Sequence, residues 1–149
     1  MPRDIREENL VYAGTNQLRF VHIPKTAGVS ILESLKKSIK ESDSDWLIRG
    51  GLGTFHEKSS IINRQKPRGG NDFSFLFTRN TWDRFVSSYV YLSEKQNDEY
   101  EEHIKPFKSF KDFAINGSIE SLHFRPQTYW FDSKVDFVGR FENLQSDFN

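Results

Sequence analysis

Residues 20–30 read Phe20-Val21-His22-Ile23-Pro24-Lys25-Thr26-Ala27-Gly28-Val29-Ser30, and this stretch decides the fold class. It predicts a short apolar strand, a tight turn that contains Lys25 and Gly28, and an amphipathic helix that follows at once. Backbone N–H groups at the start of such a helix point outward, the helix dipole favours negative charge there, and Lys25 adds a full positive charge. The stretch therefore predicts a cradle for a phosphate-like anion.

The order of residues in this cradle differs from that of the Walker A loop. In G-x-x-x-x-G-K-[ST] the lysine follows the last glycine. Here Lys25 precedes Gly28, and the first glycine is absent. The sequence therefore argues against an ordinary nucleoside triphosphate as the ligand.

The composition restricts the class of protein. The chain has 149 residues, a formal net charge of zero and no cysteine. A chain of this length buries roughly 68–70% of its unfolded surface as one domain. Zero net charge argues against nucleic acid as a partner, and the lack of cysteine excludes a disulfide framework and a cysteine metal site. No signal core and no run of roughly 20 apolar residues is found, so we expect a soluble, cytoplasmic protein with neither a membrane partner nor a metal.

The hydrophobic pattern predicts an α/β architecture with a parallel sheet and covering helices. Strands are expected at residues 18–23, 73–78 and 135–138, with either a short strand or a plain connection at 46–48, and helices at 27–40, 57–64, 81–93 and 107–115. Strand, loop and helix alternate twice before the last strand, which favours parallel pairing. We expect residues 1–16 to be a loose leader, residues 17–149 to be a single domain, and the acidic segment 94–102 to be solvated.

The expected helix over residues 81–93 begins just after the strand at 73–78. Its apolar stripe is Trp82, Phe85, Val86, Tyr89 and Val90, of which the aromatic residues Trp82, Phe85 and Tyr89 are expected in the core. Arg79 stands at the strand exit, and Ser87 lies two turns into the helix. Because ligands of open parallel sheets bind at the carboxyl ends of the strands, the exits at Pro24 and Arg79 should face one crevice. Two anion sites there suit a ligand with phosphates on both sides of a ribose.

These motifs resemble those of the sulfotransferases that use 3′-phosphoadenosine 5′-phosphosulfate (PAPS), in particular the carbohydrate branch. Four segments match in the family's order: residues 22–30, 79–89, 123–129 and 135–144. The resemblance implies a P-loop NTPase-like three-layer fold with a central parallel sheet. Family members usually continue into further helices, so we expect a domain that is minimal at its C-terminal end, is completed by a partner, or is a fragment. The resemblance also implies transfer of a sulfuryl group to a hydroxyl, with a carbohydrate as the acceptor.

The resemblance assigns roles residue by residue. Lys25 and His56 would be catalytic: Lys25 would neutralise the leaving phosphate, and His56 would be the general base. Residues that would bind the cofactor are Pro24, Lys25, Thr26, Ala27, Gly28, Val29 and Ser30 around the 5′-phosphate, and Arg79 and Ser87 at the 3′-phosphate. His123 and Arg125 would contact the acceptor. Val29 departs from the usual threonine or serine, and Thr81 from the usual proline.

Other interpretations of the same residues remain open. A P-loop kinase would share the fold, although the lysine order is wrong for it. A non-catalytic module that binds the desulfated product (PAP) or another nucleotide would keep the cradle without transferring anything. Among single residues, His22 is expected to pack locally, Asp83 and Arg84 to form a structural pair, and Glu142 to be a structural partner of the sheet or a loop.

Overall fold

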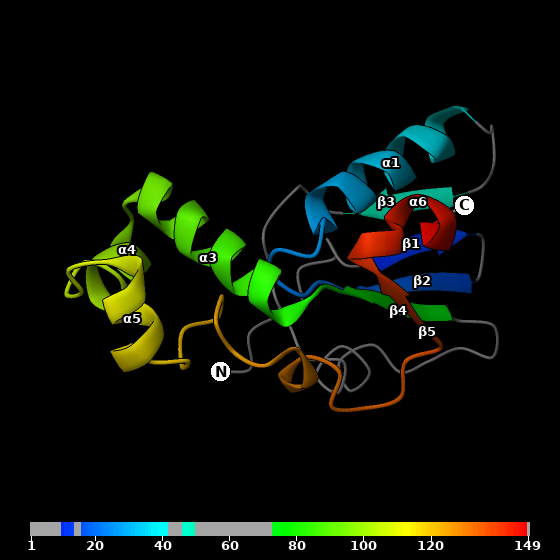
Figure 1. Ribbon diagram of the computed structural model, residues 1–149. Coiled ribbons are helices and arrows are strands. Elements are labelled where there is room, and N and C mark those ends of the chain that lie inside the picture. Colours follow the sequence, from blue (N-terminus) through cyan, green and yellow to red (C-terminus); the bar gives the residue numbers. More distant parts are fainter. Residues whose placement is uncertain (1–9, 14–15, 42–45, 50–72, 149) are drawn as a thin grey trace, which may run out of the picture.

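The computed structural model describes residues 10–13, 16–41, 46–49 and 73–148 (Figure 1). They form a mixed α/β structure around a five-stranded sheet of order β3-β1-β2-β4-β5. The strands are β1 (Leu10–Ala13), β2 (Asn16–Val21), β3 (Trp46–Arg49), β4 (Phe73–Thr78) and β5 (Phe137–Arg140). His56 and the helix expected at residues 57–64 lie outside the described residues.

The sheet combines a parallel half with an antiparallel hairpin. β4 pairs in parallel with both β2 and β5, which confirms the predicted parallel strands. β1 pairs antiparallel with β2 and with β3, so the sheet is mixed, and the predicted parallel sheet is its β2-β4-β5 part. Residues 10–13 of the expected loose leader are also a strand. A short connection between β1 and β2 makes an antiparallel hairpin the natural pairing, since parallel strands need a long crossover.

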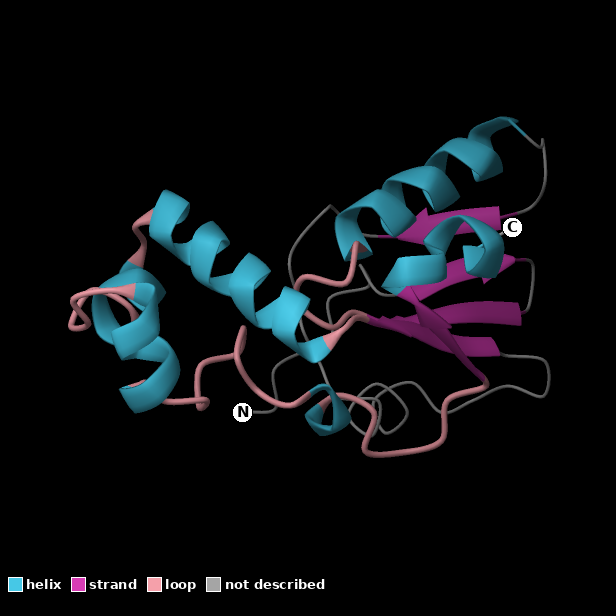
Figure 2. Ribbon diagram, viewed as in Figure 1, coloured by secondary structure: helices cyan, strands magenta, loops and turns pink. Residues whose placement is uncertain are grey.

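Apolar side chains cover both faces of the parallel strands. On one face, α1 (Gly28–Glu41) and α6 (Leu144–Phe148) lie over the sheet (Figure 2). The core there joins Phe20, Phe75 and Phe77 of the strands to Ile31 and Leu32 of α1. On the other face, the segment around Trp130 packs against Val21, Ile23 and Leu76. The parallel strands are therefore buried on both sides, as continuous apolar runs of this kind predict.

A helical extension leaves the sheet at the end of β4. It consists of α3 (Thr81–Lys95), α4 (Asp98–His103) and α5 (Phe110–Asn116), and Figure 1 shows α3 running away from the sheet toward the other two. Leu92, Ile104, Phe113 and Phe124 form its own small core. Residues 94–102 are largely exposed, as expected, and they are partly helical: α3 continues to Lys95, and the Asn97 side chain caps α4 by accepting from the Tyr100 N–H.

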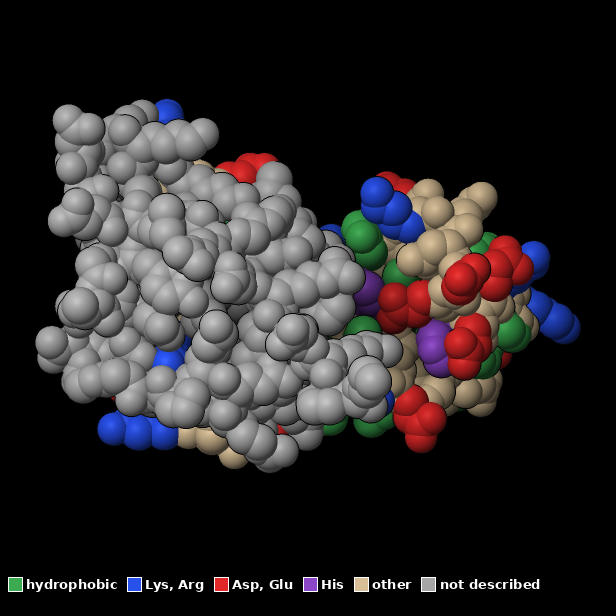
Figure 3. Space-filling model, turned by 180° about the vertical axis from the view of Figure 1, so that it is seen from behind, with side chains coloured by type: hydrophobic (Ala, Val, Ile, Leu, Met, Phe, Trp, Pro, Cys, Tyr) green, Lys and Arg blue, Asp and Glu red, His purple; other side chains and the backbone are tan. Residues whose placement is uncertain are grey.

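The apolar stripe expected on α3 is only partly buried. The buried residues of α3 are Arg84, Ser88 and Leu92, and none of them belongs to this stripe. Phe85 and Tyr89 pack on the core of the extension, but Trp82 is 78% exposed, and Val86 and Val90 are exposed as well. The prediction that Trp82 lies in the core is wrong, because α3 packs on Phe113 of α5 and Phe124 through Phe85 and Tyr89 and leaves Trp82, in its first turn, exposed. Next along the chain, α4 adds an acidic surface (Figure 3) whose exposed residues include Asp98, Glu101 and Glu102.

The last strand is tied to β4 by one carboxylate. Asp136 Oδ2 accepts hydrogen bonds from the Ser74 N–H at 2.7 Å and the Ser74 hydroxyl at 2.8 Å. The Asp136 N–H in turn donates to the Ser74 carbonyl at 2.9 Å. The strand begins at Phe137, two residues later than predicted, because residue 136 serves this junction. Two 3₁₀ turns, η2 (Gln127–Tyr129) and η3 (Phe141–Asn143), complete the described fold.

No helix within residues 16–41 and 73–148 combines the length and the apolar character that crossing a bilayer needs.

Candidate functional site

The turn between β2 and α1 has an unusual backbone. Lys25 has φ of 66° and Ala27 has φ of 69°, so two non-glycine residues adopt the left-handed conformation within three positions. Such conformations cost of order 1–3 kcal/mol each and are concentrated at functional sites. Alternation of left- and right-handed residues turns successive N–H groups toward one point and makes a concave anion site. The two left-handed residues of this turn are consistent with the predicted cradle.

Thr26 anchors this turn from inside. Its side chain is fully buried, and its hydroxyl donates to the Ile23 carbonyl at 2.9 Å. The hydroxyl proton is therefore committed to the backbone and is not available to the expected 5′-phosphate. What Thr26 can offer a ligand is its backbone N–H.

Gly28 begins α1 directly against a histidine ring. A Cβ atom at this position would lie 1.9 Å from Nε2 of His22 and 2.0 Å from its Cδ2. His22 itself is 4% exposed and stacks on Phe20, with ring centroids 5.4 Å apart. The expectation that His22 packs locally is confirmed, and this packing explains why residue 28 has no side chain.

A cavity of about 250 Å³ opens over the turn. Its lining residues are His22, Pro24, Lys25, Ala27, Gly28, Val29, Ser30, Tyr91 and His123. The loop residues that were predicted to bind the cofactor all line it, with the exception of the inward-facing Thr26. The helix start, the lysine and the turn thus meet at one concave surface.

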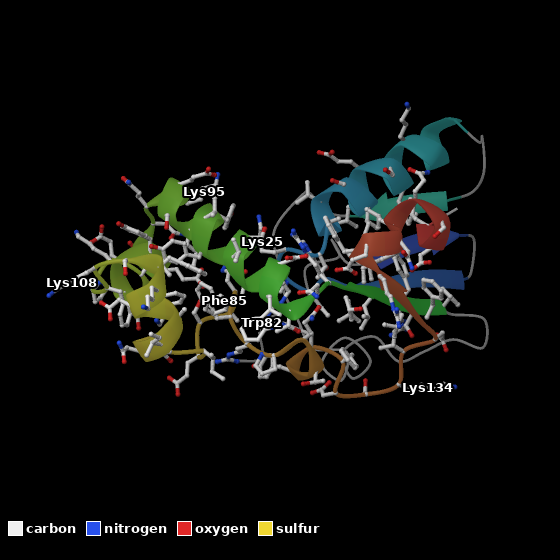
Figure 4. All side chains as sticks on the ribbon, viewed as in Figure 1. Lys25, Trp82, Phe85, Lys95, Lys108 and Lys134 are labelled. Atoms are coloured by element: carbon white, nitrogen blue, oxygen red, sulfur yellow. The ribbon has the colours of Figure 1, made fainter. Side chains whose placement is uncertain are left out.

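Lys25 extends from the turn toward α3. Its Nζ lies 4.2 Å from the ring centroid of Tyr91, and Lys95 approaches the same ring at 5.7 Å. Figure 4 shows Lys25 on one side of α3, with Trp82 and Phe85 on the other. Burial, together with the positive charge of Arg79, lowers the pKa of Lys25, and this outweighs the opposite effect of Glu94. A lysine in this state gains from a bound anion, which stabilises its charged form.

Arg79 joins the second strand exit to the first. Its Nη1 donates to the Lys25 carbonyl at 3.3 Å, and its guanidinium stacks 4.2 Å from the ring centroid of Phe141. The side-chain amide of Gln127 holds the Arg79 backbone from both sides, accepting from its N–H at 2.8 Å and donating to its carbonyl at 2.7 Å. These contacts place the two strand exits side by side, but Pro24 and Arg79 line two neighbouring cavities and not the single crevice that was predicted.

A second cavity of about 380 Å³ lies beside Arg79. Its lining residues are Thr78, Arg79, Asn80, Arg140, Glu142 and Asn143. Glu142 accepts from the Asn80 N–H at the start of α3, which confirms its structural role. That hydrogen bond, with the nearby charges of Arg79 and Arg140, lowers the pKa of Glu142. Ser87, the other residue expected at the 3′-phosphate, is half-buried on α3 and lines neither of these two cavities.

Arg84 ties the turn to the segment that follows the helical extension. Its guanidinium donates to the carbonyls of Pro24 at 3.3 Å and His123 at 3.0 Å, and also to that of Arg125. Arg84 is buried against these carbonyls, whereas Asp83 is exposed. The prediction that Asp83 and Arg84 form a structural pair is therefore wrong. Burial lowers the pKa of Arg84 to about 10. The Pro24 turn and His123 are therefore held at a fixed separation by one buried cation.

The two residues that were expected at the acceptor occupy different places. His123 lines the first cavity, and its Nδ1 lies 2.9 Å from both carboxylate oxygens of Glu99. Arg125 lines neither of the two cavities described above. Its Nε donates to the Glu120 carbonyl at 2.8 Å, and its guanidinium stacks 4.4 Å from the ring centroid of Tyr129.

Three residues of this region were missed by sequence reasoning, namely Tyr91, Glu99 and Gln127. Tyr91 follows Arg84 and Ser88 at helical spacing, so the inward face of α3 carried a recognisable signal. Gln127 lies inside the quoted segment 123–129 but had no assigned role. Glu99 had no signal, because its partner His123 is 24 positions away in the sequence.

Comparison with known proteins gives one family. The sequence matches the family model described as the sulfotransferase family over residues 8–149. No curated protein and no solved structure matches the chain.

Proposed function

Since the chain belongs to the sulfotransferase family, we propose that it transfers a sulfuryl group from PAPS to a hydroxyl, with a carbohydrate as the acceptor class. The observation that carries this proposal is the strained turn at Lys25 and Ala27, which forms an anion cradle between β2 and α1. A strand, an anion-binding turn and a helix in this order also support a P-loop-like arrangement.

The donor set of the site fits the two phosphates of PAPS. The N–H groups at the start of α1, together with Lys25, provide positive charge for the 5′-phosphosulfate at the first cavity. Arg79 provides a planar guanidinium for the 3′-phosphate at the neighbouring strand exit. We propose Ser87 as its companion from α3, reached when the ligand lies between the two cavities.

The chemistry requires few further groups. PAPS supplies an activated sulfuryl group whose bond to the 5′-phosphate breaks as the acceptor oxygen attacks sulfur. Lys25 stabilises the negative charge that develops on the phosphate, and the fixed N–H groups orient it for in-line transfer. A general base must take the hydroxyl proton; the resemblance gives this role to His56, and Arg125 remains a proposed acceptor contact.

We expect Lys25→Ala to lower the rate of PAP formation by about 10²–10³-fold, the loss typical when one charge-stabilising donor is removed. The assay uses PAPS with a mixture of unsulfated polysaccharides. Lys95→Ala is the matched control, because Lys95 approaches the same Tyr91 ring but does not line the cavity. An unchanged rate in Lys25→Ala would remove Lys25 from the mechanism.

A further inference from the structure

A histidine and a carboxylate form a pair on the wall of the first cavity. His123 lines this cavity together with Lys25 and the start of α1. Its Nδ1 lies 2.9 Å from each carboxylate oxygen of Glu99, which belongs to α4. A carboxylate on one ring nitrogen fixes both the orientation and the tautomer of an imidazole, as in metal sites and catalytic triads.

His123 is also held from its backbone side. Its carbonyl accepts from Nη1 of Arg84 at 3.0 Å and from the Ser88 hydroxyl at 3.0 Å. Its ring lies against Tyr91, with ring centroids 5.3 Å apart. The side chain of His123 is 13% exposed. The position of the imidazole is therefore set by α3 and α4 together, as preorganised chemistry requires.

The charge state of Glu99 determines which ring nitrogen carries the proton. Burial alone raises the pKa of Glu99, but hydrogen bonds from His123 and Ser121 outweigh it and hold this pKa below its ordinary value. The carboxylate is therefore ionised at neutral pH and accepts from an N–H at Nδ1. In a neutral imidazole Nε2 is then the basic nitrogen.

The pair stands next to the group that would stabilise the leaving phosphate. Lys25 Nζ lies 4.2 Å from the ring centroid of Tyr91, and the ring of His123 packs on that same tyrosine. One continuous wall thus carries a cation and an oriented imidazole. Proton removal and charge stabilisation are the two functions that transfer to a hydroxyl needs.

We propose that His123, positioned by Glu99, is the general base that accepts the proton of the acceptor hydroxyl, the role that the resemblance gives to His56. This inference rests on the proposed function. As the acceptor oxygen bonds to sulfur, its proton moves to Nε2 of His123. The electron pair of the broken sulfur–oxygen bond stays on the phosphate beside Lys25. Glu99 touches no reacting atom and is a positioning residue.

The first test is spectroscopic and needs no acceptor. The whole protein, labelled with ¹⁵N in its four histidines, is saturated with PAP at about pH 7.5, and His123→Gln assigns the signal. We expect the two ring nitrogens of His123 to show a neutral imidazole with the proton on Nδ1. A proton on Nε2 alone, or a doubly protonated ring that forms a permanent ion pair with Glu99, would overturn the proposal.

Variants of α4 test the positioning role. Glu99→Ala is expected to abolish the preference for Nδ1–H and to lower the rate of PAP formation about 10-fold or more, within the range of such orienting contacts. Its affinity for PAP should stay as in the wild type. Glu102→Ala is the matched control on the same helix, since the Glu102 side chain is 75% exposed. Equal tautomer signals in the wild type and Glu99→Ala would contradict the role of Glu99.

Turnover of PAPS tests the base directly. His123→Ala should lose about 10²–10⁴ in rate, the usual worth of a positioned base, and added imidazole should restore part of this loss. His103→Ala serves as the control. Normal turnover in His123→Ala, with loss in His56→Ala, would return the role to His56. Failure of the wild type to bind PAP would instead contradict the proposed function, so the two failures are distinguishable.

Discussion

At the scale of single residues, the site depends on a few backbone conformations. Lys25 and Ala27 hold positive φ angles without being glycines. The buried Thr26 hydroxyl donates to the Ile23 carbonyl and holds the turn in this shape. Strain that the surrounding structure maintains is a way to preorganise a binding site. The anion then meets N–H groups that need no reorganisation.

Gly28→Ala should damage the cradle. The added Cβ would meet the buried His22 ring at 1.9 Å, so the ring or the start of α1 must move. Overpacking of this kind costs typically about 1–3 kcal/mol, and we expect PAP affinity to fall with it. Urea unfolding and calorimetry with PAP measure both effects.

The double variant His22→Ala/Gly28→Ala provides the control, because removing the ring makes room for the methyl group. Its loss in the free energy of unfolding should be smaller than the sum of the losses in the two single variants. Additive losses would mean that contact with His22 is not what requires glycine at residue 28.

Lys25 gives PAP binding a distinctive dependence on pH. Burial and the charge of Arg79 lower its pKa, so it loses its proton at a lower pH than an ordinary lysine. Only the protonated form attracts the phosphate. PAP affinity should therefore be full at neutral pH and fall as pH rises through the lowered pKa. Binding should take up protons in that range, measured by calorimetry in buffers of different ionisation enthalpy.

In Lys25→Met this alkaline decline in affinity should disappear. A decline of the same size in Lys25→Met would assign the titration to another group.

At the scale of elements, α3 organises the site through one polar face. Arg84, Ser88 and Tyr91 follow at helical spacing and reach the turn, the His123 carbonyl and the cavity. The opposite side of α3 carries the exposed Trp82. The sheet contributes the other half, because parallel β2 and β4 bring Pro24 and Arg79 to one edge. β5 then supplies Arg140 at the second cavity.

The junction between β4 and β5 depends on Asp136. Asp136→Ala leaves the N–H of the buried Ser74 without its acceptor, and we expect a loss of about 1–3 kcal/mol in the free energy of unfolding. Asp136→Asn keeps one oxygen acceptor and should lose less. Urea denaturation compares the variants, and equal stability of Asp136→Ala and the wild type would show that this junction does not support the sheet.

At the scale of the whole molecule, the site lies where the sheet meets the helical extension (Figure 1). The turn and Arg79 belong to the sheet, whereas Tyr91, Glu99 and His123 come from the extension and the segment after it. Arg84 joins the two parts by bonding carbonyls of both. Residues from distant positions are thereby assembled around one cavity.

The sequence predicts the parts of this arrangement that local patterns determine. Hydrophobic periodicity predicted β2, β4, α1 and α3. The rule that the carboxyl ends of parallel strands lie at one edge of the sheet predicted that Lys25 lies near Arg79. The hairpin strand β1 was missed because a run of only four apolar residues gives little periodic signal. The exposure of Trp82 and the pairing of Glu99 with His123 depend on how the extension packs, which is a tertiary property that no local pattern records.

Calorimetric titration of the full chain with PAP, with ADP as the comparison, tests the central claim most directly. If Arg79 recognises the 3′-phosphate that ADP lacks, PAP should bind more tightly than ADP by roughly 10–100-fold, the worth of one charge-assisted contact. Arg79→Ala should remove most of this preference. Equal affinities of the wild type for PAP and ADP would contradict the assignment of this site to PAPS.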